Sequence, residues 1–208
     1  MAGWGLIAIG ILGIATSTFL YFNQSRPPKQ APHDVSVAAS TPSSVALSPK
    51  AVASYSVPPN DPKYIAAPAI DIPNTPILRL GLLKSGAIAT PNNVNETGWY
   101  ESSSRPGQPG AVFVYGHVST WTAKGAFFNL KKLKHGDIVT ITRGDNQVFR
   151  YAVVSTKVYP YNKVDMDEVL APVDPNVSGL NLMTCTGQVI KHSSEFNQRF
   201  VVFTKLVS

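Results

Sequence analysis

Residues 180–187 read Leu180-Asn181-Leu182-Met183-Thr184-Cys185-Thr186-Gly187, an apolar run that carries the only cysteine of the chain. If this run is a β-strand, successive side chains alternate between two faces, so Met183 and Cys185 share one face and Leu182 and Thr184 share the other. Gly187 then ends the strand and leaves the thiol beside a loop, where protein scaffolds commonly present a nucleophile. A lone cysteine is also often a small buried hydrophobic residue, and the thiol alone leaves both interpretations open.

The composition fits one globular domain of ordinary size. The chain has 208 residues, of which 44% are hydrophobic and 14% charged, enough to bury one core. The net charge is +6, but the basic residues form no long run, and no basic pattern interleaved with aromatic residues indicates nucleic-acid binding. Lys131, Lys132 and Lys134 form the densest basic cluster, which we interpret as a solvated face. A single cysteine excludes an internal disulfide.

The N-terminal residues predict a membrane anchor. Residues 4–22 contain no charge and match the length of a bilayer-spanning helix, so we predict an uncleaved transmembrane anchor over residues 1–22. A cleaved signal peptide is the alternative, because Ala15-Thr16-Ser17 resembles a cleavage site, although no positively charged region precedes the apolar run. Arg26 and Lys29 follow the run, and the positive-inside rule would place them on the cytoplasmic side, against an external C-terminal domain.

Residues 23–60 form a predicted linker that separates the anchor from the domain at 61–208. The linker has seven prolines, many serines and alanines, and no glycine, which is typical of an extended spacer with a reach of roughly 100 Å.

The domain itself has the pattern of an antiparallel or mixed β-barrel or sandwich. Short β-like runs are separated by Gly, Pro and Asn turns, and helical periodicity is scarce. The predicted strands cover residues 64–72, 77–82, 111–115, 138–142, 148–159, 180–185 and 200–207, and short helices are predicted at 81–89 and 164–170. Near the second helix, Asp165, Asp167, Glu168 and Asp174 lack the spacing and the glycine of a calcium loop, so we interpret them as solvated charges and predict no metal site.

Two further residues stand out by their positions on strands. His117 follows the apolar run Ala111-Val112-Phe113-Val114-Tyr115-Gly116, so it lies at a strand end as Cys185 does. Arg199 opens the last predicted strand and shares a face with Val201 and Phe203 if that strand is regular. If the strands of Cys185 and Arg199 are neighbours, thiol and guanidinium lie side by side. His135 and His192 lie in polar turns and are predicted to be surface residues.

A cysteine, a histidine and an arginine together can carry out acyl transfer. The thiolate of Cys185 would attack a carbonyl carbon, His117 would protonate the departing amine, and Arg199 would stabilise the oxyanion of the tetrahedral intermediate. Positive charge near the thiol would raise its ionised fraction. The sequence identifies no carboxylate or amide that would orient His117.

These motifs resemble the sortases, membrane-anchored cysteine transpeptidases of bacterial cell envelopes, and their local character is most similar to class F. The resemblance spans about residues 64–207. The matching pieces are Gly116-His117 after an apolar strand, Leu182-Met183-Thr184-Cys185, Arg199, Gly98-Trp99-Tyr100, the turn from Pro106-Gly107 to Gly110, and Phe127-Phe128-Asn129-Leu130 leading to Gly136-Asp137. Asn181 departs from the family's Thr-Leu-any-Thr-Cys pattern, and the N-terminus lacks positive charge.

The resemblance implies a mainly β fold, an eight-stranded barrel with one or two short helices behind an N-terminal transmembrane helix. It also implies Cys185 as nucleophile, His117 as general acid and then base, Arg199 as oxyanion stabiliser, and Thr184 beside the substrate peptide. The substrate would be a Leu-Pro-any-Thr-Gly-like sorting signal of a surface protein, and the acceptor an amine of the cell wall or of a pilin. No cofactor is implied, and the domain would lie outside the cytoplasm on a single-pass anchor.

Three alternatives stay open to different degrees. A cysteine hydrolase with the same three residues differs only in using water as acceptor, which the sequence does not exclude. An L,D-transpeptidase is disfavoured, because Thr186-Gly187 follows the cysteine where that family has an arginine two residues later. A membrane-tethered binding domain without chemistry would tolerate the loss of Cys185.

Overall fold

The computed structural model describes residues 36–38 and 54–208. No helix within these two ranges is both long enough and apolar enough to cross a membrane. The predicted anchor at residues 1–22 and most of the predicted linker lie outside the described residues.

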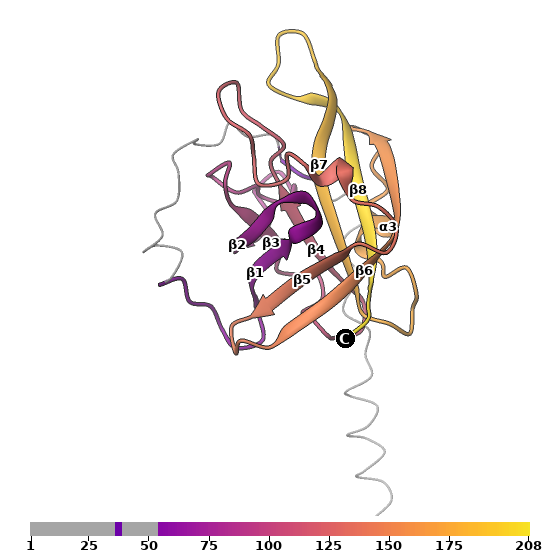
Figure 1. The fold of residues 1–208 in the computed structure, drawn as a ribbon. Helices are drawn as coiled ribbons and strands as arrows, with labels where there is room; N and C mark the ends of the chain where they lie inside the picture. The colour runs from indigo at the N-terminus through magenta and orange to yellow at the C-terminus, as the bar shows by residue number, and fades with distance from the viewer. Residues whose placement is uncertain (1–35, 39–53) are drawn as a thin grey trace, which may run out of the picture.

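Eight strands form a closed barrel, which confirms the predicted mainly β fold (Figure 1). Their order around the barrel is β1-β2-β3-β4-β7-β8-β6-β5, and antiparallel pairing of β5 with β1 closes it. The strands are β1 (Pro62–Ala67), β2 (Ile72–Leu80), β3 (Thr97–Tyr100), β4 (Ala111–Gly116), β5 (Ile138–Arg143), β6 (Val148–Pro160), β7 (Gly179–Val189) and β8 (Phe196–Leu206). Most neighbours are antiparallel, but β2 with β3 and β4 with β7 are parallel.

The first predicted strand, 64–72, ends earlier than predicted, because β1 stops at Ala67 and β2 begins only at Ile72. Pro68 starts a short 3-10 helix, η1 (Pro68–Ile70), and Asp71 adopts a left-handed conformation with φ of 60°. These two residues turn the chain so that β1 and β2 pair antiparallel with each other. The four-residue strand β3 was not predicted as a strand, because it is too short to show a period.

One predicted helix is present and the other is not. Helix α3 (Met166–Leu170) lies within the predicted range 164–170, and the Asp165 side chain accepts a hydrogen bond from the amide of Glu168 at its N-terminus. The predicted helix at 81–89 is wrong. There the chain turns through Gly86, whose φ is 82°, and Leu82 pairs with Ile88 in an antiparallel bridge.

The acidic residues around α3 serve local structure. Glu168 accepts hydrogen bonds from Lys157 and from the Tyr159 hydroxyl, both at 2.6 Å. Asp174 accepts a hydrogen bond from the amide of Asn176 at 2.9 Å.

Alternation along the strands divides the buried residues into two layers. Val112, Val114, Leu180 and Leu182 belong to the cluster inside the barrel, to which all eight strands contribute. The residues between them on the strands face the other way. Together with residues of α3 and of the β2–β3 loop they form a second, outer cluster: Leu80, Ile88, Tyr100, Phe113, Tyr115, Tyr159, Met166, Val169, Met183, Val201 and Phe203. Cys185 packs against this outer cluster, so the candidate nucleophile lies on the outer face of the barrel wall.

Candidate active site

Cys185 and Arg199 are direct partners across two neighbouring strands. In the antiparallel pair of β7 and β8, the Cα atom of Cys185 lies opposite that of Arg199. Val201 and Phe203, which follow Arg199 at a spacing of two, belong to the outer cluster against which Cys185 packs. Side chains at directly opposite positions share a face, so the predicted juxtaposition of thiol and guanidinium is confirmed. The expectations that Gly187 ends this strand and that Arg199 opens the last one are wrong. Strand β7 continues to Val189 and β8 already begins at Phe196, so the connecting loop is shorter than the sequence suggested.

Tyr115 contacts the thiol from the other neighbouring strand. Strand β4 lies parallel to β7 with Tyr115 opposite Met183, and the Tyr115 hydroxyl lies 3.2 Å from the Cys185 Sγ atom. Tyr115 is only 3% exposed, and its ring also meets the ring of His117 edge-on, with centroids 5.5 Å apart. One side chain therefore touches both the candidate nucleophile and the candidate acid.

His117 is held by a backbone carbonyl. Its Nε2 atom lies 2.8 Å from the carbonyl oxygen of Pro91, in the β2–β3 loop. A carbonyl oxygen can only accept, so Nε2 carries the proton and Nδ1 is left to exchange protons. Among the described residues, the hydrogen bond of His117 goes to Pro91 and not to Cys185 or Arg199. The orienting partner that the sequence did not identify is thus a main-chain group, which no side-chain pattern can reveal.

Thr184 points away from Cys185, into the barrel. It is 1% exposed, and its hydroxyl donates a hydrogen bond of 2.7 Å to the carbonyl of Gly116. The resemblance places Thr184 beside the substrate peptide, whereas this contact ties β7 to the residue that precedes His117. The Phe127 ring packs under Gly116 so closely that a Cβ atom there would lie 2.7 Å from it. These contacts position the end of β4 and therefore the imidazole.

Arg199 is buried and largely engaged by its own hairpin. It is 5% exposed, its Nη2 atom pairs with the Glu195 carboxylate at 2.5 Å, and Nη1 donates to the carbonyls of Phe196 and Gln198 at 2.9 and 3.2 Å. Its guanidinium carbon lies 5.9 Å from the centre of the Tyr161 ring. Glu195 and Tyr161 were not singled out from the sequence, because polar loop residues carry no periodic signal.

The electrostatics of the site favour neutral forms of the thiol and the imidazole. Burial raises the pKa of Cys185, although the charge of Arg199 and the hydrogen bond from Tyr115 oppose this rise. Burial lowers the pKa of His117, against the opposing effect of its hydrogen bond to Pro91. Burial also raises the pKa of Tyr115 well above its usual value, so this hydroxyl keeps its proton and can donate it to the sulfur.

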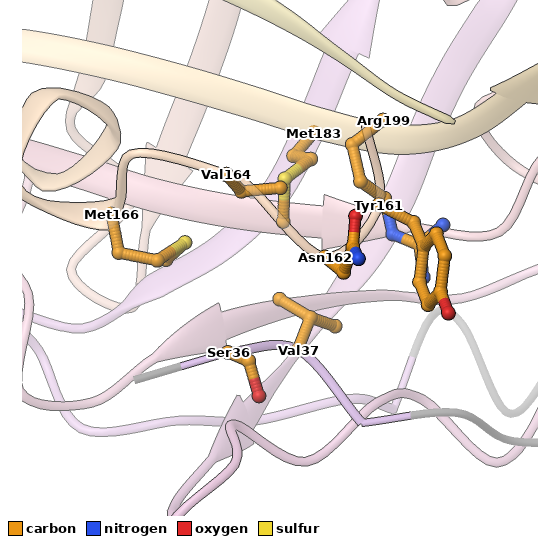
Figure 2. A pocket seen from close by; sticks show the side chains of 8 residues that line it. All are labelled: Ser36, Val37, Tyr161, Asn162, Val164, Met166, Met183 and Arg199. Carbon is orange, nitrogen blue, oxygen red and sulfur yellow. The ribbon is translucent and has the colours of Figure 1, made fainter. Parts of the chain in front are cut away.

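A small cavity adjoins Arg199 on the outer face. Its volume is about 90 Å³, and the residues that line it are Ser36, Val37, Tyr161, Asn162, Val164, Met166, Met183 and Arg199 (Figure 2). The segment between β6 and α3 forms one wall, and Met183, two residues before Cys185, forms another. The cavity thus lies next to the candidate catalytic residues, with a mostly apolar lining.

His135 and His192 are exposed, as predicted, and neither lies among the candidate catalytic residues. The structure therefore brings together Cys185 and Arg199 as strand partners, and His117 joins them through Tyr115.

Comparison with known proteins identifies a family for this arrangement. The family model described as the sortase domain matches residues 65–207. No match was found among curated protein sequences. Among solved structures, sortase A from Corynebacterium diphtheriae is 26% identical with a TM-score of 0.53, over 70% of this chain and 60% of that protein.

Two other sortases have similar structures. Sortase C-1 from Streptococcus pneumoniae is 25% identical with a TM-score of 0.54, over 70% of this chain and 66% of its own. A sortase D5 transpeptidase from Clostridium perfringens shares the fold at 24% identity and a TM-score of 0.51, over 70% of this chain and 78% of its own. The chain thus spans about 60% of the length of the Corynebacterium protein and about two thirds of the Streptococcus protein. With the family model covering most of its length and the same barrel in these structures, the chain belongs to the sortase family.

Proposed function

We propose that this protein is a cysteine transpeptidase that cleaves a Leu-Pro-any-Thr-Gly-like sorting signal between Thr and Gly and transfers the acyl group to an amine. Membership of the sortase family supports this activity. The observation that supports it most directly is the cross-strand pair of Cys185 and Arg199, with His117 linked to the same thiol through Tyr115.

The proposed reaction begins from a neutral thiol and a neutral imidazole. The free nitrogen of His117 takes the Cys185 proton as Sγ attacks the carbonyl carbon of the signal's threonine. The negative charge then develops on the former carbonyl oxygen, where the Arg199 guanidinium stabilises it. The C–N bond breaks, the imidazolium gives its proton to the departing glycine amine, and a thioester on Cys185 remains.

The second half of the reaction resolves the thioester. An acceptor amine attacks the thioester carbonyl, and His117 takes a proton from that amine. The C–S bond then breaks, and the imidazolium returns the proton to the departing sulfur, which restores the thiol. Attack by water at this stage would instead give the free acid, so the product distinguishes a transpeptidase from a hydrolase.

The cellular setting is a proposal from the sequence. We propose that residues 1–22 anchor the protein in the cell membrane by a single span, that residues 23–60 carry the domain away from the bilayer, and that residues 61–208 act outside the cytoplasm. The partners would be sorting signals of surface proteins and an amine of the cell wall or of a pilin. The printed names of the similar structures are sortases A, C and D, and assignment to class F stays a prediction.

The test is a mass-spectrometric assay of the full-length protein in detergent, with a library of sorting-signal peptides and a small amine. We expect a thioester on Cys185 and a new amide after the threonine, both lost in Cys185→Ala. Release of the free acid alone would support the hydrolase. A folded protein that forms no adduct with any peptide would contradict the enzymatic proposal.

A further inference from the structure

Asn181 is an amide side chain buried in an apolar layer. Its neighbours on β7, Leu180 and Leu182, belong to the inner cluster, so Asn181 faces outward. There it lies opposite Phe113 of β4 and Phe203 of β8, two members of the outer cluster. Asn181 is 0% exposed, and its Oδ1 atom has no hydrogen-bond partner among the described residues. A polar atom buried in this way destabilises the fold, so the amide needs a compensating interaction.

The amide nitrogen of Asn181 holds the C-terminal end of α3. Its Nδ2 atom donates to the carbonyls of Val169 and Ala171, both at 2.8 Å. The last carbonyls of a helix have no partner within the helix, so these bonds satisfy groups that α3 leaves open. A helix of five residues is too short to be stable alone, and its position depends on tertiary contacts. Asn181 supplies such a contact from the strand that carries Cys185.

Helix α3 continues one wall of the cavity beside Arg199. The residues of this wall follow β6 and run into the first turn of α3: Tyr161, Asn162, Val164 and Met166 (Figure 2). At its other end the wall is tied to β8, because the amide of Tyr161 donates to the carbonyl of Asn197 at 3.1 Å. The two strands that carry Cys185 and Arg199 therefore each hold one end of the wall.

The contact depends on the residue type at position 181. The sortase pattern has a threonine here, whose shorter side chain carries one donor, whereas the amide of Asn181 carries two. One side chain that binds two carbonyls at once therefore requires the amide. The departure of this chain from the family's pattern is thus accompanied by a contact that threonine cannot make in full.

We propose that Asn181 is a positioning residue, which holds α3 and the wall from Tyr161 to Met166 where a bound sorting-signal peptide meets them beside Cys185. This inference rests on the proposed function, since it assumes that the outer face receives a peptide. The hydrogen bonds of Asn181 go to α3, so its loss affects peptide binding and not the chemistry. Release of α3 lowers the fraction of molecules with a formed wall, which weakens the measured affinity by the same factor.

Two substitutions in the full-length protein remove the contact to different degrees. Asn181→Leu has a similar volume and suits the apolar surroundings, but it has no donor, so both carbonyls lose their partner. Asn181→Thr introduces the residue of the family's pattern and keeps one donor. Thr204→Val is the matched control, because Thr204 is also 0% exposed and its hydroxyl donates to a main-chain carbonyl, that of Leu180, at 2.6 Å.

The first readout is steady-state kinetics with a Leu-Pro-Ala-Thr-Gly peptide and a small amine. We expect Asn181→Leu to raise KM at least about 5-fold and to keep kcat within about 2-fold, as the loss of one or two hydrogen bonds of typical strength would give. Asn181→Thr should raise KM less, and Thr204→Val should keep the wild-type KM. An unchanged KM in Asn181→Leu would overturn the proposal. So would a lower kcat at unchanged KM, which would mean that Asn181 acts on the catalytic residues.

The second readout is hydrogen exchange without peptide at the amide of Val169, which donates to the carbonyl of Asp165 within α3 at 3.0 Å. We expect this amide to exchange at least about 5-fold faster in Asn181→Leu than in the wild type or in Thr204→Val, because α3 opens more often. The amide of Val153, in β6, should exchange equally in all three proteins. Equal exchange at Val169 would also overturn the proposal.

The two readouts separate this inference from the proposed function. Exchange at Val169 does not depend on catalysis, so it reports on α3 even in an inactive protein. Absence of turnover in the wild type would contradict the proposed function. Turnover in the wild type and in Asn181→Leu with the same KM would contradict only the role of Asn181.

Discussion

At the scale of single residues, Tyr115 shapes the environment of Cys185, the candidate nucleophile. Its hydroxyl lies 3.2 Å from the Cys185 Sγ atom and keeps its proton, because burial raises the pKa of Tyr115. A hydroxyl that donates to sulfur stabilises the thiolate more than the thiol, so this hydrogen bond lowers the pKa of Cys185. Glu195 has the opposite effect, because its negative charge raises the pKa of the same thiol.

We predict that Tyr115→Phe shifts the pH dependence of Cys185 alkylation to higher pH. The phenyl ring keeps the packing but loses the donor, which raises the pKa of the thiol and reduces the thiolate fraction near pH 7. The alkylation rate at neutral pH should fall roughly 2- to 10-fold, as expected from one hydrogen bond. Iodoacetamide kinetics followed by mass spectrometry measure this rate, since the chain has one cysteine. An unchanged profile would show that the hydroxyl does not bind the sulfur.

We predict the opposite shift for Glu195→Gln. The amide has nearly the same shape but no charge, so the pKa of Cys185 falls and the alkylation profile moves to lower pH. The Arg199 guanidinium also loses its charged partner at 2.5 Å, which leaves more of its charge for the thiolate. The same alkylation assay serves here. A shift to higher pH would mean that Glu195 acts mainly by holding Arg199 in place.

Sequence reasoning could identify the catalytic candidates at this scale but not their neighbours. Apolar periodicity placed Cys185 and Arg199 on strands and His117 directly after one, although only His117 lies at a strand end in the structure. The partner of His117 is the main-chain carbonyl of Pro91, which has no sequence signal. Tyr115 occupies an ordinary strand position, and only the parallel pairing of β4 with β7 brings its hydroxyl to the thiol.

At the scale of elements, two loops position the site. The β2–β3 loop contacts His117 through Pro91 and binds the segment Ser36–Ala38 through Ile88. The chain after β4 folds back on itself, because the amides of Phe127 and Gly125 donate to the carbonyls of His117 and Val118 at 3.0 and 2.9 Å. The first loop thereby holds the imidazole of His117, and the second holds its main-chain carbonyl.

We predict that Gly125→Ala lowers kcat/KM by about 10- to 100-fold. A Cβ atom at this position would lie 2.2 Å from the carbonyl oxygen of His117, and a main-chain group so placed must move. Small displacements of a catalytic group carry losses of this size. Gly81→Ala is the control, because its Cβ atom would meet only the flexible Glu101 side chain, at 3.2 Å. Full activity of Gly125→Ala would show that the imidazole tolerates movement of its backbone.

Elements were predictable where apolar runs are long. β4, β6, β7 and β8 lie where alternating or continuous apolar runs predict strands. The false helix at 81–89 arose because its apolar residues are spaced as in a helix, while Gly86 supplies a left-handed turn that reverses the chain. Short elements depend on tertiary partners, so local periodicity does not determine them.

At the scale of the whole molecule, closure by β1 and β5 makes the barrel one cooperative unit. Ile65 in β1 pairs with Thr75 on one side and Ile141 on the other, and its side chain is fully buried in the inner cluster. The strands of Cys185 and Arg199 belong to the same closed sheet, so the site depends on closure far from it. The strand pattern alone left a barrel and a sandwich open, and the family resemblance was needed to imply the closed barrel, because closure joins residues about 75 positions apart.

We predict that Ile65→Ala lowers the free energy of unfolding by about 2–5 kcal/mol, the usual loss when a fully buried isoleucine is truncated. Urea unfolding followed by tryptophan fluorescence measures the change. Val148→Ala, at an exposed position on β6, should change stability by less than about 0.5 kcal/mol. Equal effects of the two substitutions would argue against a tightly packed barrel interior.

The solitary thiol has a consequence for how long the proposed activity would last. Oxidants attack the thiolate, and a sulfenic acid on Cys185 would find no second thiol in the chain with which to form a protective disulfide. Further oxidation to the sulfinic acid would end activity permanently. Burial raises the pKa of Cys185, so the resting sulfur stays in the form that peroxide attacks slowly. The burial that keeps the Cys185 thiol protonated at rest would thus also protect it from oxidation between turnovers of the proposed reaction.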